Sequence, residues 1–481
     1  MKNVFNEILL KSKASKNQFI LDKNYTYDDF YKKFNQYKEL IKKNCIKRKQ
    51  VILVVSNYSI EFISLIFAIQ STDHVICLVS PNASSYEINY FTKETNCKYI
   101  FSNITLSSKK TIKKKKLKDF FFYETSLTSK GIKEKDCLII FTSGTTNKPK
   151  GVVLSLGAIS SNVFSISESL NLKSNYKTII FSPPSYAMAI SQILTYMLNK
   201  LPILFINTGV KFPFDFVNKI KKFDISFLNL SISAFRILHP FLKKQKTFLR
   251  KIKFVMSGGM QMTKDVFDQF KKTFPSAFFI NFYGCTENSP RISHYKFKDF
   301  TGDVVPVGKP LKGIKLKIDK KKSYLKTGEV MVSGSSLMRC YLNLPNITKA
   351  KFKKKWFKTG DLGYLDENKD LILVGRVDDS FRVGHEKLCP EEIEPLIKKK
   401  LYLDQFVIAK KKDYLLDWIP VLVLFGKKKN LSITEIYRKL KPYVAAFKIP
   451  REIIYFKKIP RTNYGKIDRK LINEKINKFK K

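Results

Sequence analysis

A run of hydroxyl, glycine and lysine side chains between two apolar stretches has the composition of an anion-binding loop. Residues 141–151 read Phe-Thr-Ser-Gly-Thr-Thr-Asn-Lys-Pro-Lys-Gly, and the apolar runs Leu138–Phe141 and Val152–Leu154 flank them. Glycine lets backbone N–H groups turn inward, hydroxyls donate further hydrogen bonds, and lysines supply positive charge. The loop is not of the Walker A type, because no Gly-Lys-Ser/Thr follows four residues after a glycine. We therefore predict an anion-binding loop between two buried strands.

Three further segments place polar side chains where chemistry could be done. The first, Tyr283–Glu287, reads Tyr-Gly-Cys-Thr-Glu and follows an expected strand at Ala277–Asn281, the position at which open α/β sheets bind ligands. The second, Trp356–Tyr364, contains Thr-Gly-Asp, and the third, Pro460–Arg469, contains Tyr-Gly-Lys. A carboxylate can hold Mg²⁺ or accept two hydroxyl groups, and a lysine can neutralise charge that develops on a phosphate.

In this order, the four segments resemble the motifs of the adenylate-forming superfamily. This superfamily comprises acyl- and aryl-CoA synthetases, peptide-synthetase adenylation domains and luciferases. The resemblance extends from about Tyr25 to Leu471 and includes two more segments, Ser257–Gly259 and Gly375–Asp379. It implies an AMP-forming ligase that joins a carboxylate to the α-phosphate of ATP, releases pyrophosphate and passes the acyl group to a thiol.

The resemblance also implies a role for each motif residue. Tyr283 would stack on adenine, Thr286 would reach the α-phosphate, and Asp361 would accept both ribose hydroxyls. Lys466 would lie between the attacking carboxylate and the α-phosphate. The implied catalytic residues are Lys466, Glu287 and Thr286, and Glu287 is also the implied metal ligand. The implied cofactor-binding residues are Thr142, Ser143, Gly144, Thr145, Thr146, Lys150, Ser257, Gly258, Gly259, Tyr283, Gly284, Asp361, Arg376, Asp378, Gly384 and Lys387.

The C-terminal part resembles the mobile lid of this superfamily. By resemblance, residues 1–375 form an adenylate-forming domain, residues 376–379 a hinge, and residues 380–481 an α+β lid that carries the catalytic lysine. The lid would rotate about Asp378 between the two steps, withdrawing Lys466 and presenting Gly384–Lys387 to the pantetheine channel. The implied cofactors are ATP, Mg²⁺ and coenzyme A, or the phosphopantetheine of an acyl carrier protein in place of coenzyme A.

Four residues depart from the superfamily pattern. Asn147, Cys340, His385 and Tyr464 stand where glycine or another small residue is usual. Asparagine tolerates a left-handed backbone, so Asn147 is compatible with the same loop path. The position of His385 leaves coenzyme A and a carrier protein open as acceptors. A degenerate member that binds ATP without forming pyrophosphate is another alternative, and the retained carboxylates and lysine argue against it.

Apolar patterns along the chain indicate the elements that position these motifs. The β-branched run Val51–Val55, the apolar helix Ile60–Ile69 and the strand Val75–Val79 belong to a β/α succession. Such a succession predicts a largely parallel sheet with helices on its faces. The lysine run Lys109–Lys118 is expected to be a solvated loop. The predicted fold class is α/β: a large N-terminal domain with βα-layered sheets and a small distorted β segment, then a small mobile α+β C-terminal domain.

Two segments adjoin the expected acyl pocket without belonging to a superfamily motif. In the first, Tyr186 and Met188 would shape a largely apolar wall. The second, Arg291–Ser293, could line the site or belong only to a strand. The histidines at positions 74, 239 and 294 have no partner at ligand spacing.

Composition bounds the remaining possibilities. A chain of 481 residues with 44% hydrophobic residues fits a soluble globular protein of two or three domains. The N-terminus lacks the apolar core of a signal peptide, and polar residues interrupt the longest apolar region, so no transmembrane segment is expected. Seven cysteines without Cys-x-x-Cys spacing indicate free thiols in a reducing cytoplasm.

The formal charge of +50 suggests a hypothesis of another class, a protein that binds nucleic acid or an acidic membrane. A lysine-rich bias spread over a solvated surface explains the same charge, because lysines occur in every part of the chain. We favour this bias and expect no nucleic-acid partner. The expected partners are a small-molecule carboxylate and either coenzyme A or an acyl carrier protein.

Overall fold

The computed structural model describes residues 2–45, 48–106, 111–142, 149–243, 245–319, 328–376, 381–384, 386–388, 390–426, 431–460 and 469–478. The chain forms two compact units. The larger unit comprises Met1–Pro81, Asn89–Phe141 and Gly151–Gly375, and the smaller comprises Asn82–Ile88, Thr142–Lys150 and Arg376–Lys481. The assignment of residues 1–375 to nucleotide binding, 376–379 to a hinge and 380–481 to a lid stays a prediction.

The first sheet of the larger unit has eight strands, of which the central ones are parallel. Its central strand is a fully buried run of β-branched and leucine residues, a pattern typical of parallel sheets covered on both faces. In spatial order the strands are β19 (Cys340–Tyr341), β9 (Lys150–Ser155), β8 (Asp136–Thr142), β4 (Val75–Val79), β3 (Val51–Val55), β5 (Tyr99–Ser102), β7 (Phe120–Thr125) and β6 (Thr111–Leu117).

One strand of this sheet corrects a prediction. The lysine run Lys109–Lys118, which we expected to be a solvated loop, contains the edge strand β6, paired antiparallel with β7. The lysines are compatible with an edge strand because their ammonium groups lie over aromatic rings of β7: Lys114 is 5.0 Å from the centre of Phe121, and Lys115 is 5.3 Å from that of Phe122. Charged side chains at a sheet edge also oppose pairing with other chains.

A second sheet of nine strands carries two of the predicted motifs, Ser257–Gly259 and Tyr283–Glu287. Its strands from β11 to β14 are parallel, and β15 returns antiparallel to β14. In spatial order the strands are β16 (Lys309–Pro310), β15 (Arg291–Phe297), β14 (Phe278–Gly284), β13 (Phe254–Gly258), β12 (Phe227–Asn229), β10 (Thr178–Ile180), β11 (Ile203–Phe205), β1 (Gln18–Ile20) and β2 (Tyr25–Thr26). A third sheet of five strands contains β17 (Ile314–Asp319), β18 (Gly328–Gly334), β20 (Phe352–Lys353), β21 (Trp356–Leu365) and β22 (Leu371–Arg376).

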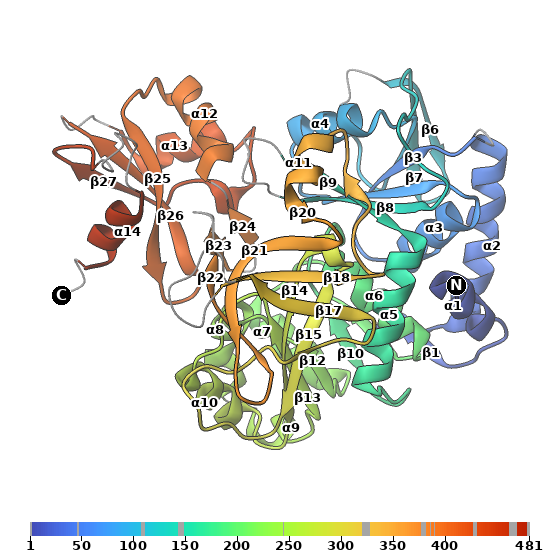
Figure 1. Cartoon of the computed structure of the whole chain (residues 1–481). Coiled ribbons are helices and arrows are strands. Elements are labelled where there is room, and N and C mark those ends of the chain that lie inside the picture. The colour runs from blue at the N-terminus through green and yellow to red at the C-terminus, as the bar shows by residue number, and fades with distance from the viewer. Residues whose placement is uncertain are drawn as a thin grey trace. The chain divides into compact units, whose positions relative to one another are not determined.

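Helices cover these sheets and form two hydrophobic clusters with them. One hydrophobic cluster combines side chains of the eight- and nine-stranded sheets with α3, α5 and α6, and a second cluster covers the other face of the nine-stranded sheet with α7, α8 and α10. Figure 1 shows α5 and α6 side by side. The helices are α1 (Val4–Ser12), α2 (Tyr27–Asn44), α3 (Ile60–Ser71), α4 (Ser85–Thr95), α5 (Leu156–Leu170), α6 (Ala187–Leu198), α7 (Pro213–Lys222), α8 (Ile232–Leu242), α9 (Lys246–Leu249), α10 (Lys264–Thr273) and α11 (Pro345–Lys351).

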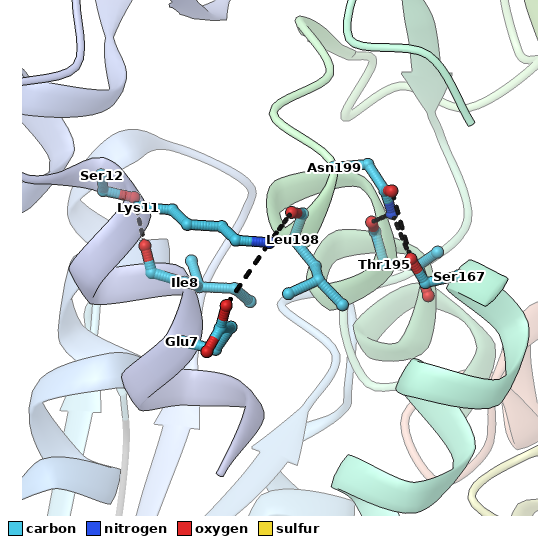
Figure 2. A network of polar contacts seen from close by, with 8 residues as sticks. All are labelled: Glu7, Ile8, Lys11, Ser12, Ser167, Thr195, Leu198 and Asn199. Atoms are coloured by element: carbon cyan, nitrogen blue, oxygen red, sulfur yellow. Dashed lines mark hydrogen bonds and ion pairs between the residues drawn. The ribbon is translucent and has the colours of Figure 1, made fainter. Parts of the chain in front are cut away.

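Polar contacts fix the C-terminal end of α6 against its neighbours (Figure 2). Asn199 donates to the Oγ of Ser167 on α5 at 2.8 Å and to the carbonyl of Thr195 at 2.7 Å. From α1, the ammonium group of Lys11 donates to the carbonyl of Leu198 at 3.4 Å. These bonds satisfy backbone carbonyls that a helix end leaves without an intrahelical partner. The last turn of α6, which carries the buried Tyr196, is therefore held in place.

The smaller unit contains an α+β module. Its sheet has the strands β24 (Glu386–Leu388), β23 (Phe381–Val383), β26 (Asp417–Phe425), β25 (Phe406–Asp413) and β27 (Glu452–Phe456). Its helices are α12 (Pro390–Leu401), α13 (Ile433–Leu440) and α14 (Arg469–Lys478), and two apolar clusters cover the two faces of the sheet. Among the described residues of the whole chain, no helix has both the length and the apolar character that a membrane span requires.

Candidate active site

The predicted anion-binding loop lies between adjacent strands of the eight-stranded sheet. Thr142 ends β8, and Lys150, which is buried, begins β9. Gly151 follows, and a Cβ atom there would lie 3.2 to 3.3 Å from three side chains, so only glycine fits without displacement of its neighbours. The predicted loop residues Ser143, Gly144, Thr145 and Thr146 lie outside the described residues. The structure thus places the two ends of the loop, at a strand-to-strand connection.

The Ser257–Gly259 segment lies at the C-terminal end of β13. A Cβ atom on Gly258 would lie 2.6 Å from the ring of Phe282 on the neighbouring strand, so this ring rests directly on the glycine backbone. Gly259 has a φ of +86°, which an L side chain rarely adopts. The buried hydroxyl of Ser257 makes no hydrogen bond within the part of the chain that the structure describes. Gly258 is therefore favoured by its contact with the Phe282 ring, and Gly259 by its left-handed backbone conformation.

The Tyr283–Glu287 segment begins at the end of β14, directly beside β13. A Cβ atom on Gly284 would lie 2.1 Å from the carbonyl oxygen of Pro290, and the N–H of Cys285 donates to that same oxygen at 2.9 Å. The chain then forms a single 3₁₀ turn at Thr286–Asn288 and returns as β15. This tight turn places Thr286 and Glu287 at the carboxyl end of a parallel region of the sheet, the location predicted for the site.

Two predicted site residues from different sheets meet in a short hydrogen bond. The hydroxyl of Tyr283 donates to Oδ2 of Asp361 at 2.6 Å, across 78 positions of sequence. Asp361 lies on β21, where its N–H donates to the Oγ1 of Thr359 at 3.1 Å. Burial, together with the negative charge of Asp361, raises the pKa of Tyr283 well above its usual value of 10, so Tyr283 stays a hydrogen-bond donor.

Glu287 is held by a residue that the sequence did not identify as part of the site. The hydroxyl of Tyr341 donates to Oε1 of Glu287 at 2.6 Å, and the N–H of Met338 donates to the carbonyl of Glu287 at 2.7 Å. Tyr341 is itself held in place, because it lies in β19, which pairs with β9, and because the N–H of Tyr341 donates to the Oγ1 of Thr348 at 3.0 Å. Tyr341 directly follows Cys340 in the sequence Met338-Arg339-Cys340-Tyr341, and only Cys340 of this segment was identified from the sequence.

The carboxylate of Glu287 is compatible with the implied magnesium ion. Mg²⁺ is often held by one or two carboxylates, with waters and substrate phosphates completing its octahedron. No cluster of three or more histidine, cysteine, aspartate or glutamate side chains able to hold a metal occurs in the described ranges. A magnesium site formed by the carboxylate of Glu287 and the phosphates of a nucleotide needs no such cluster.

Arg291 begins β15 beside the turn, and its side chain is buried. The guanidinium carbon lies 4.1 Å from the centre of the Phe282 ring, and only 3% of the residue is exposed. Its backbone is held by Asn162, which donates to the Arg291 carbonyl at 2.7 Å and accepts from its N–H at 3.1 Å. The sequence left two possibilities for Arg291, a residue that lines the site or a residue that belongs only to a strand. In the structure Arg291 is part of β15, and its guanidinium also lies against the Phe282 ring that covers Gly258.

The smaller unit contains the remaining predicted residues. Gly384, with a φ of +67°, connects the paired strands β23 and β24, and its N–H donates to the carbonyl of Leu416 at 2.7 Å. Lys387 lies in β24, and Arg376 ends β22. Asp378, His385 and Lys466 lie outside the described residues. The structure therefore gives the backbone positions of Gly384, Lys387 and Arg376 and does not test their predicted roles.

Comparison with known proteins identifies relatives along most of the chain. Residues 11–342 match the family model of the AMP-binding enzyme. Zwittermicin A synthase ZmaJ of Bacillus cereus is 23% identical, and the match covers 93% of this chain and 89% of that protein. A 2-succinylbenzoate–CoA ligase of Lactococcus lactis is 25% identical over 88% of this chain and 90% of that protein. A solved structure of a double mutant of o-succinylbenzoate CoA synthetase from Bacillus subtilis superimposes with a TM-score of 0.82 at 18% identity, and the match covers 98% of both chains.

Proposed function

Because the chain belongs to the AMP-binding enzyme family and is an AMP-forming acid–thiol ligase, we propose that it transfers an acyl group from ATP-activated carboxylate to coenzyme A. In the first step a carboxylate oxygen attacks the α-phosphorus of ATP. The new P–O bond forms as the bond to the bridging oxygen breaks, and pyrophosphate leaves. In the second step a thiolate sulfur attacks the acyl carbon, and AMP leaves with the bonding electrons of the acyl–oxygen bond.

The contact between Tyr283 and Asp361 supports this proposal most strongly. The two residues come from motifs with separate predicted tasks, adenine stacking and ribose binding, and they meet at 2.6 Å. Adenine and ribose are adjacent parts of one nucleotide, so their binding residues must lie close together. In the proposed complex, the ring of Tyr283 contacts adenine and Asp361 accepts the ribose hydroxyls as a charge-assisted acceptor. The loop that begins at Thr142 and ends at Lys150 binds the phosphates.

Glu287 and Thr286 act at the reacting end of the nucleotide in the proposed complex. Thr286 donates to the α-phosphate, and Glu287 holds Mg²⁺ with the support of Tyr341. The ion, when bound, supplies positive charge beside the phosphates and stabilises the negative charge on the leaving pyrophosphate. The hydroxyl of Tyr341 donates to one oxygen of Glu287 and so orients the carboxylate, which leaves the other oxygen available to the ion.

Lys466 and the smaller unit complete the proposed cycle. By resemblance to the superfamily, Lys466 orients the attacking carboxylate and neutralises charge at the α-phosphate in the first step. The smaller unit then rotates about the segment 376–379, and Gly384–Lys387 reach the pantetheine channel in the second. This sequence of events predicts that the variant Lys466→Ala loses adenylate formation and retains thiolysis of a supplied acyl-adenylate.

A carrier protein is the alternative acceptor. The similarity to a 2-succinylbenzoate–CoA ligase favours coenzyme A, and the residue at position 385, a histidine where glycine is usual, leaves a carrier protein as the alternative. We retain coenzyme A as the proposal because a 2-succinylbenzoate–CoA ligase and a 4-coumarate–CoA ligase are both among the relatives of this chain. A cytoplasmic location and the lack of a nucleic-acid partner stay predictions.

The experiment that tests the function is pyrophosphate release from Mg·ATP with a panel of carboxylic acids, each with and without coenzyme A. Release that depends on an acid and rises with coenzyme A is the expected result. Release that depends on an acid and ignores coenzyme A would favour the carrier protein. Silence with every acid, together with intact ATP binding, would contradict the proposal and favour a degenerate family member.

A further inference from the structure

We propose that Arg291 binds a second anionic group of the acid substrate, so that the enzyme selects dicarboxylic acids and activates one of their two carboxylates. This inference rests on the proposed function and specifies the substrate class of the same site. It rests on a buried cation without an anionic partner, on the polar atoms around it and on the position of the cation beside the Tyr283–Glu287 turn.

The guanidinium of Arg291 is buried and has no anionic partner in the part of the chain that the structure describes. It makes no ion pair among the described residues, and its Nη1 atom, shielded from solvent, has no hydrogen-bond partner. The ring of Phe282 is its principal neighbour, at 4.1 Å. Burial lowers the pKa of Arg291 to about 10, which still leaves it charged at neutral pH. Proteins almost always pair a buried charge, so an unpaired one indicates a binding site whose anion comes from a ligand.

Two further buried polar atoms near Arg291 also make no hydrogen bond of normal geometry with the described residues. The hydroxyl of Tyr196, on the fixed last turn of α6, interacts weakly with the side chains of Thr178 and Gln192, and it makes no hydrogen bond of normal geometry in the described part of the chain. Nδ1 of His294, which lies opposite Phe282 in the β14–β15 pair, likewise makes no hydrogen bond in that part of the chain. The charge of Arg291 acts on both groups: it limits the rise in the pKa of Tyr196, and with burial it helps to lower the pKa of His294 to about 4.

These three groups form a suitable set for a carboxylate. At neutral pH Arg291 is a cation with several donors, Tyr196 is a protonated hydroxyl, and His294 is a neutral imidazole. A carboxylate accepts two parallel hydrogen bonds from a guanidinium and a further one from a hydroxyl. A ligand with an ammonium group would meet the positive charge of Arg291 directly. The arrangement therefore favours a dicarboxylic acid and disfavours an amino acid.

The position of Arg291 connects this set to the reacting groups. Arg291 pairs with Gly284 in the β14–β15 register, and the turn that carries Thr286 and Glu287 lies between them in sequence. The ring of Phe282 contacts both the Gly258 backbone and the guanidinium. A ligand bound at Arg291 therefore lies beside the elements that we assign to the acyl pocket and the α-phosphate.

The test compares acids that differ only in the second carboxylate: succinate with butanoate, glutarate with pentanoate, and 1,4-benzenedicarboxylate with benzoate. Pyrophosphate release gives kcat/KM for the wild type, Arg291→Met, Arg291→Lys and the exposed control Arg250→Met. We expect the wild type to prefer a dicarboxylate. Arg291→Met should lower kcat/KM for that acid by about 10- to 100-fold, the range for loss of a charged hydrogen bond, and leave its monocarboxylate partner nearly unchanged. Arg291→Lys should retain part of the activity, and Arg250→Met all of it.

A second readout keeps the inference testable without turnover. The dicarboxylate alone should raise the Tm of the wild type and fail to raise that of Arg291→Met. If no acid supports turnover yet this shift is present in the wild type and lost in the variant, the proposed function fails and the anion site stands. The inference is overturned by a preference for the monocarboxylate, by equal loss for both acids in a folded Arg291→Met protein, or by no Tm shift in the wild type. A raised KM for ATP in Arg291→Met, with the acid preference unchanged, would assign Arg291 to a phosphate instead.

Discussion

The region that we assign to the nucleotide (Tyr283, Glu287, Tyr341 and Asp361) and the region that we assign to the acid (Tyr196, Arg291 and His294) differ in how their polar side chains are hydrogen-bonded. We call them the nucleotide region and the acid region. In the nucleotide region two predicted carboxylates already have a donor: Tyr283 for Asp361 and Tyr341 for Glu287, both at 2.6 Å. In the acid region the buried guanidinium of Arg291 and its neighbours Tyr196 and His294 have atoms without a hydrogen bond of normal geometry to any described residue. The two regions are adjacent, because both flank the turn between β14 and β15.

This difference indicates two ways of preparing a binding site. Residues that are already hydrogen-bonded stay oriented without a ligand, so binding requires little reorganisation. A buried charge without a partner destabilises the free protein. Such a group forms its hydrogen bonds only when the ligand binds. We therefore expect substitutions in the nucleotide region to affect catalysis for every acid. Substitutions in the acid region should change which acids react.

The largest effect is expected for Glu287→Gln. This change removes the negative charge assigned to Mg²⁺ and should lower kcat for every acid by about 10²- to 10³-fold, the scale for loss of one electrostatic stabiliser. The measurement is acid-dependent pyrophosphate release at saturating ATP, and the matched control is Glu168→Gln, at an exposed ion pair with Lys312. A loss confined to dicarboxylates would contradict the division into two regions.

A smaller effect is expected for Tyr341→Phe. The variant keeps the ring and removes the hydroxyl that orients Glu287, so the Mg²⁺ concentration for half-maximal activity should rise by about 10-fold, as for loss of one charge-assisted hydrogen bond. Tyr37→Phe is the control, because Tyr37 also donates to a carboxylate, that of Asp119, at 2.5 Å, and has no assigned task at the site. An unchanged Mg²⁺ dependence in Tyr341→Phe would show that Tyr341 is not a positioning residue.

Gly258→Ala should perturb the acid region through Phe282. The new Cβ would lie 2.6 Å from the ring, so Phe282 must move and carry the stacked Arg291 with it. Overpacking of this kind costs about 1–3 kcal/mol, and we expect a rise in KM for the acid of roughly 3- to 10-fold with little change for ATP. The second change Phe282→Leu, which shortens the side chain, should restore part of the loss. Equal effects on both substrates would argue against a separate acid region.

The smallest effect is expected for the pH dependence of stability. Burial and the charges of Arg291 and Lys296 lower the pKa of His294 from 6.5 to about 4. The unfolded chain therefore binds a proton at higher pH than the folded one, and stability falls as pH drops from about 6.5 to about 4 and is independent of this group above 6.5. We expect a contribution of roughly 1–2 kcal/mol for this partly buried group. Urea unfolding of His294→Gln should show a weaker decrease over this interval than the wild type, and an equal decrease in the two proteins would contradict this assignment.

Local patterns in the sequence predicted the secondary-structure elements better than they predicted the side-chain contacts. The apolar runs before Thr142 and after Lys150 predicted β8 and β9, and the Tyr-Gly-Cys-Thr-Glu segment was correctly placed at a strand end. The lysine run at 109–118 was assigned wrongly, because an edge strand can have solvated lysines on its open side and aromatic rings beneath them.

The side-chain contacts of the site could not be predicted from spacing. Tyr283 and Asp361 are 78 residues apart, and Tyr341 and Glu287 are 54 apart; only tertiary folding brings these hydroxyls to the carboxylates. Arg291 followed a motif closely enough to be noticed, but its burial and lack of a partner depend on the packing of Phe282 and α6. The predicted roles of Lys466, Asp378 and the loop residues 143–146 concern residues outside the described ranges and stay predictions.

The separation of the two regions is tested most directly by calorimetric binding of ATP and of the preferred acid to Asp361→Asn and Arg291→Met. We predict that Asp361→Asn weakens ATP binding by about 10- to 100-fold and leaves acid binding nearly unchanged, since it removes only the charged acceptor assigned to ribose. Arg291→Met should do the reverse. If either folded variant weakened both ligands equally, or if the two effects were exchanged, the division of the site into a paired nucleotide region and an unpaired acid region would be wrong.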